Sequence, residues 1–174
     1  MTDAIRSYSL MAQNNAWANA TFYHAMRGMG PIEFRQPRPG FFPSLRETMN
    51  HILSVDLYYI DALEQGGEGR AVYDRPLIKR VEDLAAAQAE ADARLVAFCE
   101  GLTGESLAET RITQRDVGPV PERVDMLLLH LFQHQVHHRG QAHVQLQTTG
   151  IVPPQLDEFF LDHDRAHSAR GYFD

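Results

Sequence analysis

Cysteine is nearly absent from this 174-residue chain, which contains only Cys99. A single cysteine excludes an intrachain disulfide, and the apolar run Leu95-Val-Ala-Phe-Cys99 favours a packed side chain over a nucleophile. No stretch approaches the roughly 18 to 20 apolar residues of a membrane span. The N-terminus also lacks the basic-then-apolar order of a signal peptide. These absences predict a cytoplasmic protein without a membrane partner.

Clusters of lysine and arginine are also absent, and the net charge is −7. Because phosphate binding requires a positive surface, the sequence predicts no nucleic-acid partner. It contains no internal repeat and no low-complexity run. With 44% hydrophobic residues, the chain is long enough to bury one core, so we expect a single domain over residues 1–174.

Breaks marked by proline and glycine divide the chain into four helix-length blocks with apolar residues at helical spacing. The blocks span residues 3–27, 44–65, 81–102 and 122–149. At the start of the second block, Ser44 and Glu47 predict a reciprocal capping box. Four long helices predict an all-α protein, a four-helix bundle, whose core is the usual place for a metal held by facing helices.

Two shorter segments are expected to add to the bundle. Between residues 103 and 121 the sequence turns to a short alternating segment, which predicts a small hairpin or an extended connection before the last long helix. Residues 155–164 predict a short C-terminal helix. This helix is expected to pack back through three apolar residues, Phe159, Phe160 and Leu161.

Four histidines, His130, His134, His137 and His138, lie within nine residues of the last block. On a helix they share an arc of about a third of a turn, so their side chains can converge. Only residues three or four apart can bind one ion, because His130 and His138 are about 12 Å apart along the axis. The usable pairs are 130/134, 134/137 and 134/138. Since His134 belongs to each pair, it is the first candidate metal ligand.

A metal site needs a further ligand from another helix, and His51 is the natural choice. It lies in the middle of the second block among apolar neighbours, in Met49-Asn50-His51-Ile52-Leu53. His143 is expected to project away from the cluster, as a surface or interface residue. The remaining histidines lie near a helix end or in a polar tail, where solvated side chains are ordinary, and are excluded. They are His24, His163 and His167.

The string His134-Gln-Val-His137-His138-Arg139-Gly140-Gln141, together with Asn50-His51-Ile-Leu and Asp56, resembles the DinB family of bacterial metal-binding four-helix bundles. The resemblance covers nearly the whole chain. It implies a bundle of DinB type, a homodimer, and a site with one histidine from the second helix and two from the last long one. Those positions are His51, His134 and His138, so the resemblance decides between His137 and His138, which spacing alone leaves open.

The residues around this site have secondary candidate roles. His130 and His137 are expected near the metal or facing the substrate, with Gln141 and Gln145 on the same helix face. Glu47 lies one turn before His51 and is a candidate to orient its free ring nitrogen.

Purely structural interpretations of these residues are the alternative. Histidines at helical spacing also form hydrogen-bonded seams or protonation-sensitive interfaces, although Leu127 and Leu131 border the cluster and favour an inward-facing site. Two sets of residues are interpreted as structural. The aromatic set is expected in the core and comprises Trp17, Tyr58 and Tyr59. The acidic set is expected on a solvated helix face and comprises Glu82, Asp83, Glu90 and Asp92.

Three protein ligands leave a coordination position open, which is typical of catalytic sites. We expect one divalent transition metal per chain, first Zn or Ni, with Fe, Mn or Cu as alternatives. The resemblance to proteins that use low-molecular-weight thiols favours a metal-dependent enzyme that activates such a thiol for S-transfer to an electrophilic small molecule. One alternative is a metal-dependent hydrolase using metal-bound water, with His137 or Glu47 as proton shuttle. Another is a non-catalytic, stress-associated metal-binding module.

Overall fold

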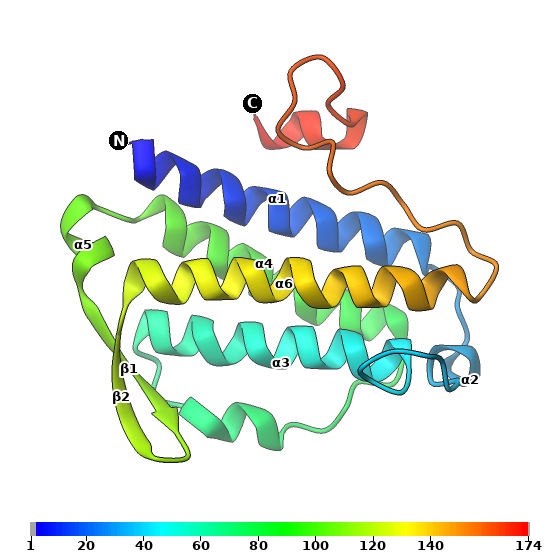
Figure 1. The fold of residues 1–174 in the computed structure, drawn as a ribbon, viewed down its shortest axis with the longest axis horizontal. Helices are drawn as coiled ribbons and strands as arrows, with labels where there is room; N and C mark the ends of the chain where they lie inside the picture. The colour runs from blue at the N-terminus through cyan, green and yellow to red at the C-terminus, as the bar shows by residue number, and fades with distance from the viewer. Residues whose placement is uncertain (1–2, 174) are drawn as a thin grey trace.

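Four long helices form the body of the molecule in this computed structural model, which describes residues 3–173. The helices lie roughly alongside one another (Figure 1). The predicted all-α class and four-helix bundle are confirmed, and each predicted block contains one of the long helices. These are α1 (Asp3–Ala25), α3 (Leu45–Glu64), α4 (Val81–Glu100) and α6 (Val124–Gln147).

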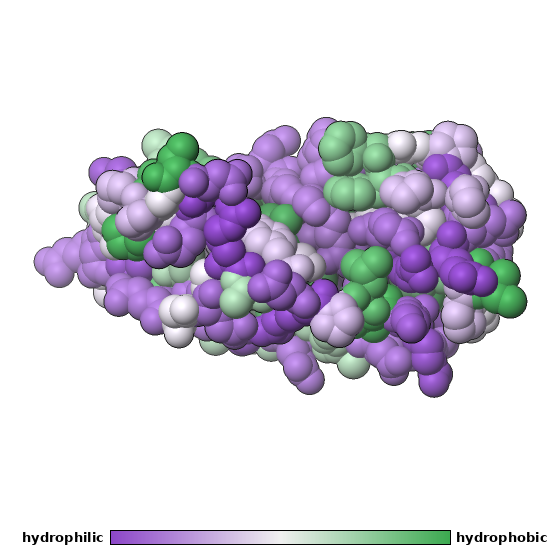
Figure 2. Space-filling view, turned by 90° about the horizontal axis from the view of Figure 1, so that it is seen from below, coloured by the Kyte–Doolittle hydropathy of each residue, from purple (hydrophilic) through white to green (hydrophobic). Residues whose placement is uncertain are grey.

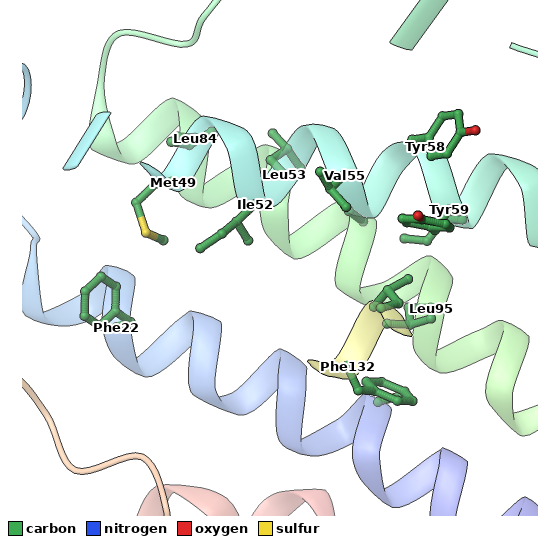
Figure 3. Close-up of a cluster of buried hydrophobic side chains, with 14 of the residues drawn as sticks. Phe22, Met49, Ile52, Leu53, Val55, Tyr58, Tyr59, Leu84, Leu95 and Phe132 are labelled. Atoms are coloured by element: carbon green, nitrogen blue, oxygen red, sulfur yellow. The ribbon is translucent and has the colours of Figure 1, made fainter. Parts of the chain in front are cut away.

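The helices pack most extensively in two pairs, α1 with α4 and α3 with α6. In Figure 1, α3 and α6 lie side by side and run in opposite directions. Apolar side chains from the helices meet in the middle of the bundle, where Phe22, Met49, Ile52 and Leu84 have almost no exposed surface (Figure 3). The two helices on which the metal ligands were predicted are therefore direct neighbours.

Short elements connect the long helices: α2 (Pro31–Phe34), η1 (Gly69–Asp74) and α5 (Gly104–Ala108). The predicted hairpin is present as β1 (Thr110–Arg115) and β2 (Gly118–Arg123), which pair antiparallel directly before α6. The hydroxyl of Tyr58 on α3 donates a 2.6 Å hydrogen bond to the carbonyl of Gln114. This bond fixes the hairpin against α3.

The C-terminal helix lies further along than predicted. Residues 155–164 contain no helix, and a single 3₁₀ segment, η2 (His167–Tyr172), follows them. Of the three apolar residues in the predicted helix, only Phe159 is buried, against Trp17 at a centroid distance of 5.6 Å. Leu156 and Phe160 are one turn apart, but Phe160 is exposed. The stretch is anchored through the aromatic contacts of Phe159 with Trp17, Tyr172 and Phe173.

The start of α3 is at Ser44 as predicted, but the reciprocal capping box does not form. Ser44 is the N-cap residue, yet its side chain makes no hydrogen bond to a backbone amide. Its hydroxyl contacts the carboxylate of Glu47, which also pairs with Arg46. A capping box forms instead at α5, between Thr103 and Ser106. These side-chain contacts explain why the carboxylate of Glu47 does not accept from the backbone amide of Ser44.

A polar network is buried among the long helices. Arg139 of α6 donates to the amide oxygens of Asn15 and Asn19, at 2.9 and 2.8 Å. The amide groups of the same two asparagines donate to Asp92 of α4, so they relay hydrogen bonds from the guanidinium to the carboxylate. The full network, defined here as the ionic network, comprises Asn15, Asn19, Asp56, Gln88, Asp92, Gln135 and Arg139.

Asp92 therefore does not belong to the solvated face of α4 on which it was predicted. Only 4% of its surface is exposed, whereas Glu82, Asp83 and Glu90 are exposed as expected. The prediction failed because Asp92 faces α1, where the two asparagine amides supply donors that no spacing rule on α4 reveals. Burial raises the pKa of Asp92 to about 6.

The surface is mostly polar. Seen from the side on which η1 and the hairpin lie, hydrophobic residues form separate patches within a largely hydrophilic face (Figure 2). Across residues 3–173, none of the helices combines the length and apolar content needed to cross a membrane.

Candidate metal centre

Three histidines converge where α3 and α6 face each other. One ring nitrogen each from His51, His134 and His138 lie within 4.8 Å of one another. The Nε2 atoms of His51 and His134 are 3.0 Å apart, and the ring centroids of His134 and His138 are 4.4 Å apart. The four-residue spacing on α6 brings its two rings to one face, and the antiparallel neighbour α3 supplies the third. This set is called the histidine triad below.

The environment keeps these rings neutral. Partial burial, followed by the proximity of His138, lowers the pKa of His51 to about 4. The same causes, with desolvation first, lower the pKa of His134 to about 3. Desolvation also lowers the pKa of His138. A neutral imidazole has a free nitrogen lone pair at pH 7, which is the form that binds a metal ion.

Gln141 orients one ring of the triad. Its Oε1 lies 2.9 Å from Nδ1 of His138, so Nδ1 is the donor and the lone pair of the ring is on Nε2. The amide nitrogen of Gln141 lies 3.1 Å from Nε2 of His137. A polar group that fixes the tautomer of a ligating histidine is the usual outer partner in metal sites. Nδ1 of His134 is buried with no partner within the described residues.

Phe42 covers one end of the triad, and sequence reasoning missed it. Its ring centroid lies 4.4 Å from that of His51 and 5.6 Å from that of His138. Gln145, predicted to face the site, instead donates to the carbonyl of Phe42 at 2.8 Å and thereby holds this loop. The available signal was the apolar pair Phe41-Phe42 inside a loop, since such residues in loops usually bury against something.

His130 and Tyr59 lie at the other end of the triad. His130 is one turn before His134 on α6, with the ring centroids 6.1 Å apart. The centroid of Tyr59 on α3 lies 4.9 Å from that of His130. Tyr58 and Tyr59 are buried in agreement with their assignment to the core, as is Trp17.

The other candidate residues lie outside the triad. His137 is exposed, with its ring centroid 4.8 Å from that of His138. Among the hydrogen bonds of the described residues, those of the Glu47 carboxylate go to Ser44 and Arg46, and none goes to His51. His143 projects away from the triad and contacts the carbonyl of Pro154 at 3.2 Å.

Cys99 is not placed for nucleophilic chemistry. Its side chain is fully buried in the core, and burial raises the pKa of its thiol to about 12. Reactive cysteines lie in exposed, electropositive settings that lower the thiol pKa. Within residues 3–173, the triad is the one group of three or more His, Cys, Asp or Glu side chains whose ligand atoms converge in this way.

The fold and the triad define a class: small helical bundles in which imidazoles from facing helices can hold one metal ion. The family model of the DinB family matches residues 1–168, and the chain belongs to that family. It is 24% identical to protein DinB of Bacillus subtilis (strain 168) over 153 residues, which cover 82% of this chain and 86% of the relative.

Two solved structures share the fold. A DinB-like protein from Bacillus cereus superposes with a TM-score of 0.62 at 18% identity, over 80% of this chain and 90% of that one. A DinB-like protein from Bacillus subtilis gives a TM-score of 0.59 at 18% identity, over 89% of this chain and 98% of that one. The resemblance inferred from the histidine string is thereby confirmed.

Proposed function

We propose that the chain binds one divalent transition metal ion through His51, His134 and His138 and uses it to activate a low-molecular-weight thiol for S-transfer to an electrophile. The observation that supports this most is the convergence of three imidazole nitrogens within 4.8 Å. We propose an enzyme because three protein ligands leave at least one coordination position of the metal ion free for a small molecule.

The donor set fits such an ion. Three neutral imidazoles suit Zn or Ni first and also match Fe, Mn or Cu, because nitrogen ligands of this type do not select strongly among them. When bound, the ion would lower the pKa of a coordinated thiol or water. The protein's own contribution is to hold the rings in place, through Gln141 on one side and the packing of Phe42 on the other.

His137 is the proposed proton acceptor. It is exposed beside His138, and its Nε2 accepts a 3.1 Å hydrogen bond from the amide nitrogen of Gln141, a contact that must open when Nε2 takes up a proton. In the reaction, the S–H bond breaks and the proton moves to His137, while sulfur bonds to the electrophilic carbon and displaces its leaving group. Glu47 has no corresponding place in this scheme, since its carboxylate is paired with Arg46.

A hydrolase is the second candidate, because the same exposed imidazole can take a proton from water as readily as from a thiol. The third is a metal-binding module without turnover. The three differ in whether a metal-loaded sample consumes a thiol with an electrophile, hydrolyses an ester or amide, or does neither.

Metal binding is tested first. Protein purified without a metal column and reconstituted with Zn or Ni is measured by elemental mass spectrometry, alongside His51→Ala and the control His130→Ala. We expect about one equivalent in the wild type and the control, and little in His51→Ala. Equal metal in all three samples would refute the triad as the binding site.

Thiol activation is tested next, on the cobalt-substituted protein. Binding of a thiol at the metal would add a sulfur-to-cobalt charge-transfer band, which a matched alcohol would not produce. His137→Ala is expected to keep the metal and the band but to slow thiol transfer. If the thiol gives no band while ester hydrolysis proceeds, the hydrolase is favoured.

We also propose a homodimer. The outer face of α6 is exposed and apolar, in contrast to its buried face, which includes Gln135 and Arg139. Exposed apolar residues aligned on one helix face often mark a protein interface. The expected mass by light scattering is twice that of the chain, and Leu129→Lys should reduce it to that of a monomer. The aligned residues are Met126, Leu129, Val136 and Val144.

A further inference from the structure

A basic and aromatic cluster lies at the hairpin end of the α3–α6 interface. Arg115 on β1 donates a 3.2 Å hydrogen bond to the hydroxyl of Tyr59, and its guanidinium carbon lies 5.5 Å from the centre of that ring. The same carbon lies 5.8 Å from the centre of the Tyr58 ring. Contacts with the two neighbouring rings restrict the position of the planar guanidinium.

The cluster connects directly to the histidine triad. Tyr59 contacts His130, and His130 lies one helical turn from His134, about 6 Å along the axis. Burial lowers the pKa of His130, and the nearby guanidinium of Arg115 lowers it further, while the carboxylate of Glu122 raises it. Contacts therefore run without a break from Arg115 through Tyr59 and His130 to His134.

Arg115 has donors to spare. A guanidinium carries five N–H groups, and the hydrogen bonds formed by Arg115 use one each toward Tyr59 and Glu122. Its side chain is 35% exposed and that of Glu122 is 31% exposed, so the pair is accessible to a ligand. The ion pair is 2.7 Å long, but partly exposed pairs of this kind are weak and can be exchanged.

The hairpin does not depend on Arg115 for its attachment. Arg111, also on β1, is only 10% exposed and donates a 3.0 Å hydrogen bond to the carbonyl of Leu63 at the end of α3. The bond from Tyr58 to Gln114 adds a second attachment. Because these contacts already hold the hairpin, the partly exposed Arg115 is free to serve a ligand.

We propose that Arg115, with Tyr59 and His130, forms a binding subsite for the carboxylate of a small-molecule thiol whose sulfur reaches the histidine triad. This inference rests on the proposed function, because it assigns the class of thiol: a mercaptocarboxylate. Guanidinium groups bind carboxylates with directed hydrogen bonds, and the exposed His130 lies between Arg115 and the triad ligand His134 along the series of ring contacts.

The carboxylate of Glu122 competes with a ligand carboxylate for the guanidinium of Arg115. It occupies one donor of Arg115 and also accepts from the hydroxyl of Thr113. A ligand carboxylate must displace or share this contact. Removing the charge of Glu122 should therefore strengthen binding of a mercaptocarboxylate, whereas removing the charge of Arg115 should weaken it, although both changes break the same ion pair.

The test measures binding of matched thiols to the metal-loaded protein by calorimetry and by the cobalt charge-transfer band. The probes are 6-mercaptohexanoate and 6-mercaptohexanol, with 3-mercaptopropionate as a shorter acid. We expect the wild type to bind 6-mercaptohexanoate about fivefold more tightly than the alcohol, which is the scale of a partly exposed ion pair. Arg115→Gln should abolish this preference without changing metal content, and Glu122→Gln should increase it.

Two further variants separate the subsite from general effects on the hairpin. Arg123→Gln removes an exposed arginine on β2 that pairs with Asp125, and it should retain the preference. Arg115→Lys keeps the charge and should retain part of it. Equal binding of acid and alcohol by the wild type, or an undiminished preference in Arg115→Gln, would overturn the subsite. Failure of both thiols to bind a metal-loaded wild type would overturn the thiol function as well.

Discussion

Two polar clusters lie within the same bundle and use adjacent residues of the same helix, α6. His134 and His138 of α6 belong to the histidine triad, and Gln135 and Arg139, one residue further along in each case, belong to the ionic network. The triad is partly buried and consists of neutral rings, whereas the ionic network is buried and contains charged groups.

The clusters differ in how their polar atoms are satisfied. In the ionic network, amide side chains accept from Arg139 and donate to the two carboxylates. In the triad, three rings that each offer a lone pair face one another with few donors between them. Donors and acceptors that pair with one another stabilise a fold, although Oδ1 of Asp56 and Oε1 of Gln88 in the ionic network have no partner among the described residues. Ring nitrogens that converge without donors between them are suited to a ligand. Each of the following predictions tests that division.

The largest effect is expected from His134→Ala. Metal bound per chain should fall from about one equivalent to none, since every pair of ligands on α6 includes this residue. In the metal-free state the free energy of unfolding should change by less than about 1 kcal/mol, because the ring has few hydrogen bonds to lose. Elemental mass spectrometry and urea unfolding in chelator measure the two quantities. A loss of several kcal/mol without metal would assign a structural role to the triad.

Arg139→Met should lower the stability of the fold, whereas His134→Ala should leave it nearly unchanged. It leaves two buried carboxylates without their cation, so the free energy of unfolding is expected to fall by about 3 to 5 kcal/mol. The matched control is Arg94→Met, which breaks a partly exposed ion pair with Glu64 and should cost less than about 1 kcal/mol. Urea unfolding of both proteins checks this. Equal stabilities would show that the network is dispensable.

Gln141→Leu should weaken metal binding without removing it. The side chain orients His138 and binds no metal itself, and loss of such an outer partner typically lowers affinity by about 10- to 100-fold. Gln141→Glu should restore or exceed the wild-type affinity, because a carboxylate is a better acceptor for Nδ1–H. Competition against a chromophoric chelator measures both variants, and wild-type affinity in Gln141→Leu would contradict the assignment.

The smallest expected effect concerns pH. Burial raises the pKa of Asp92 to about 6, so the native protein holds this proton more tightly than the unfolded chain, where the pKa is about 4. Its contribution to stability is therefore complete below about pH 4 and is lost as pH rises to about 6. In Asp92→Asn the slope of the unfolding free energy over this range should become more positive by at most about 1.4 kcal/mol per pH unit.

In the metal-free protein, the triad should change the pH dependence of stability in the direction opposite to that of Asp92. The pKa of His134 is lowered to about 3, so its contribution is present above the unfolded value of about 6.5 and is lost as pH falls toward 3. Urea titrations in chelator between pH 4 and 6.5 compare Asp92→Asn with His134→Ala. Slopes that change in the same direction would contradict the division between the clusters.

The sequence predicts the elements with strong periodicity. The four long helices follow from apolar spacing and from breaks at glycine and proline, and the convergence of His134 with His138 follows from helical geometry. His51 was selected by its setting in a long helix with apolar neighbours, and its contact with His134 depends on which helices are neighbours, which local spacing does not determine.

Features that depend on tertiary packing were missed. Phe42 covers the triad from a loop without periodicity, and Arg115 contacts Tyr59 from a two-stranded hairpin. Asp92 was assigned to solvent because its asparagine partners lie 73 and 77 residues away in sequence. The tail was predicted as a helix from its apolar residues alone, whereas Phe159 packs on Trp17, which lies far away in the sequence.

The alternation of the two clusters on α6 also fixes the orientation of the histidines. If α6 rotated about its axis by one residue, Arg139 would move from its asparagine partners toward solvent as the histidines turned away from α3. The loss of the guanidinium contacts opposes any such rotation. The ionic network thus holds α6 in the rotation that aligns the imidazoles. The entropy lost in ordering these rings is lost during folding and not each time a ligand binds.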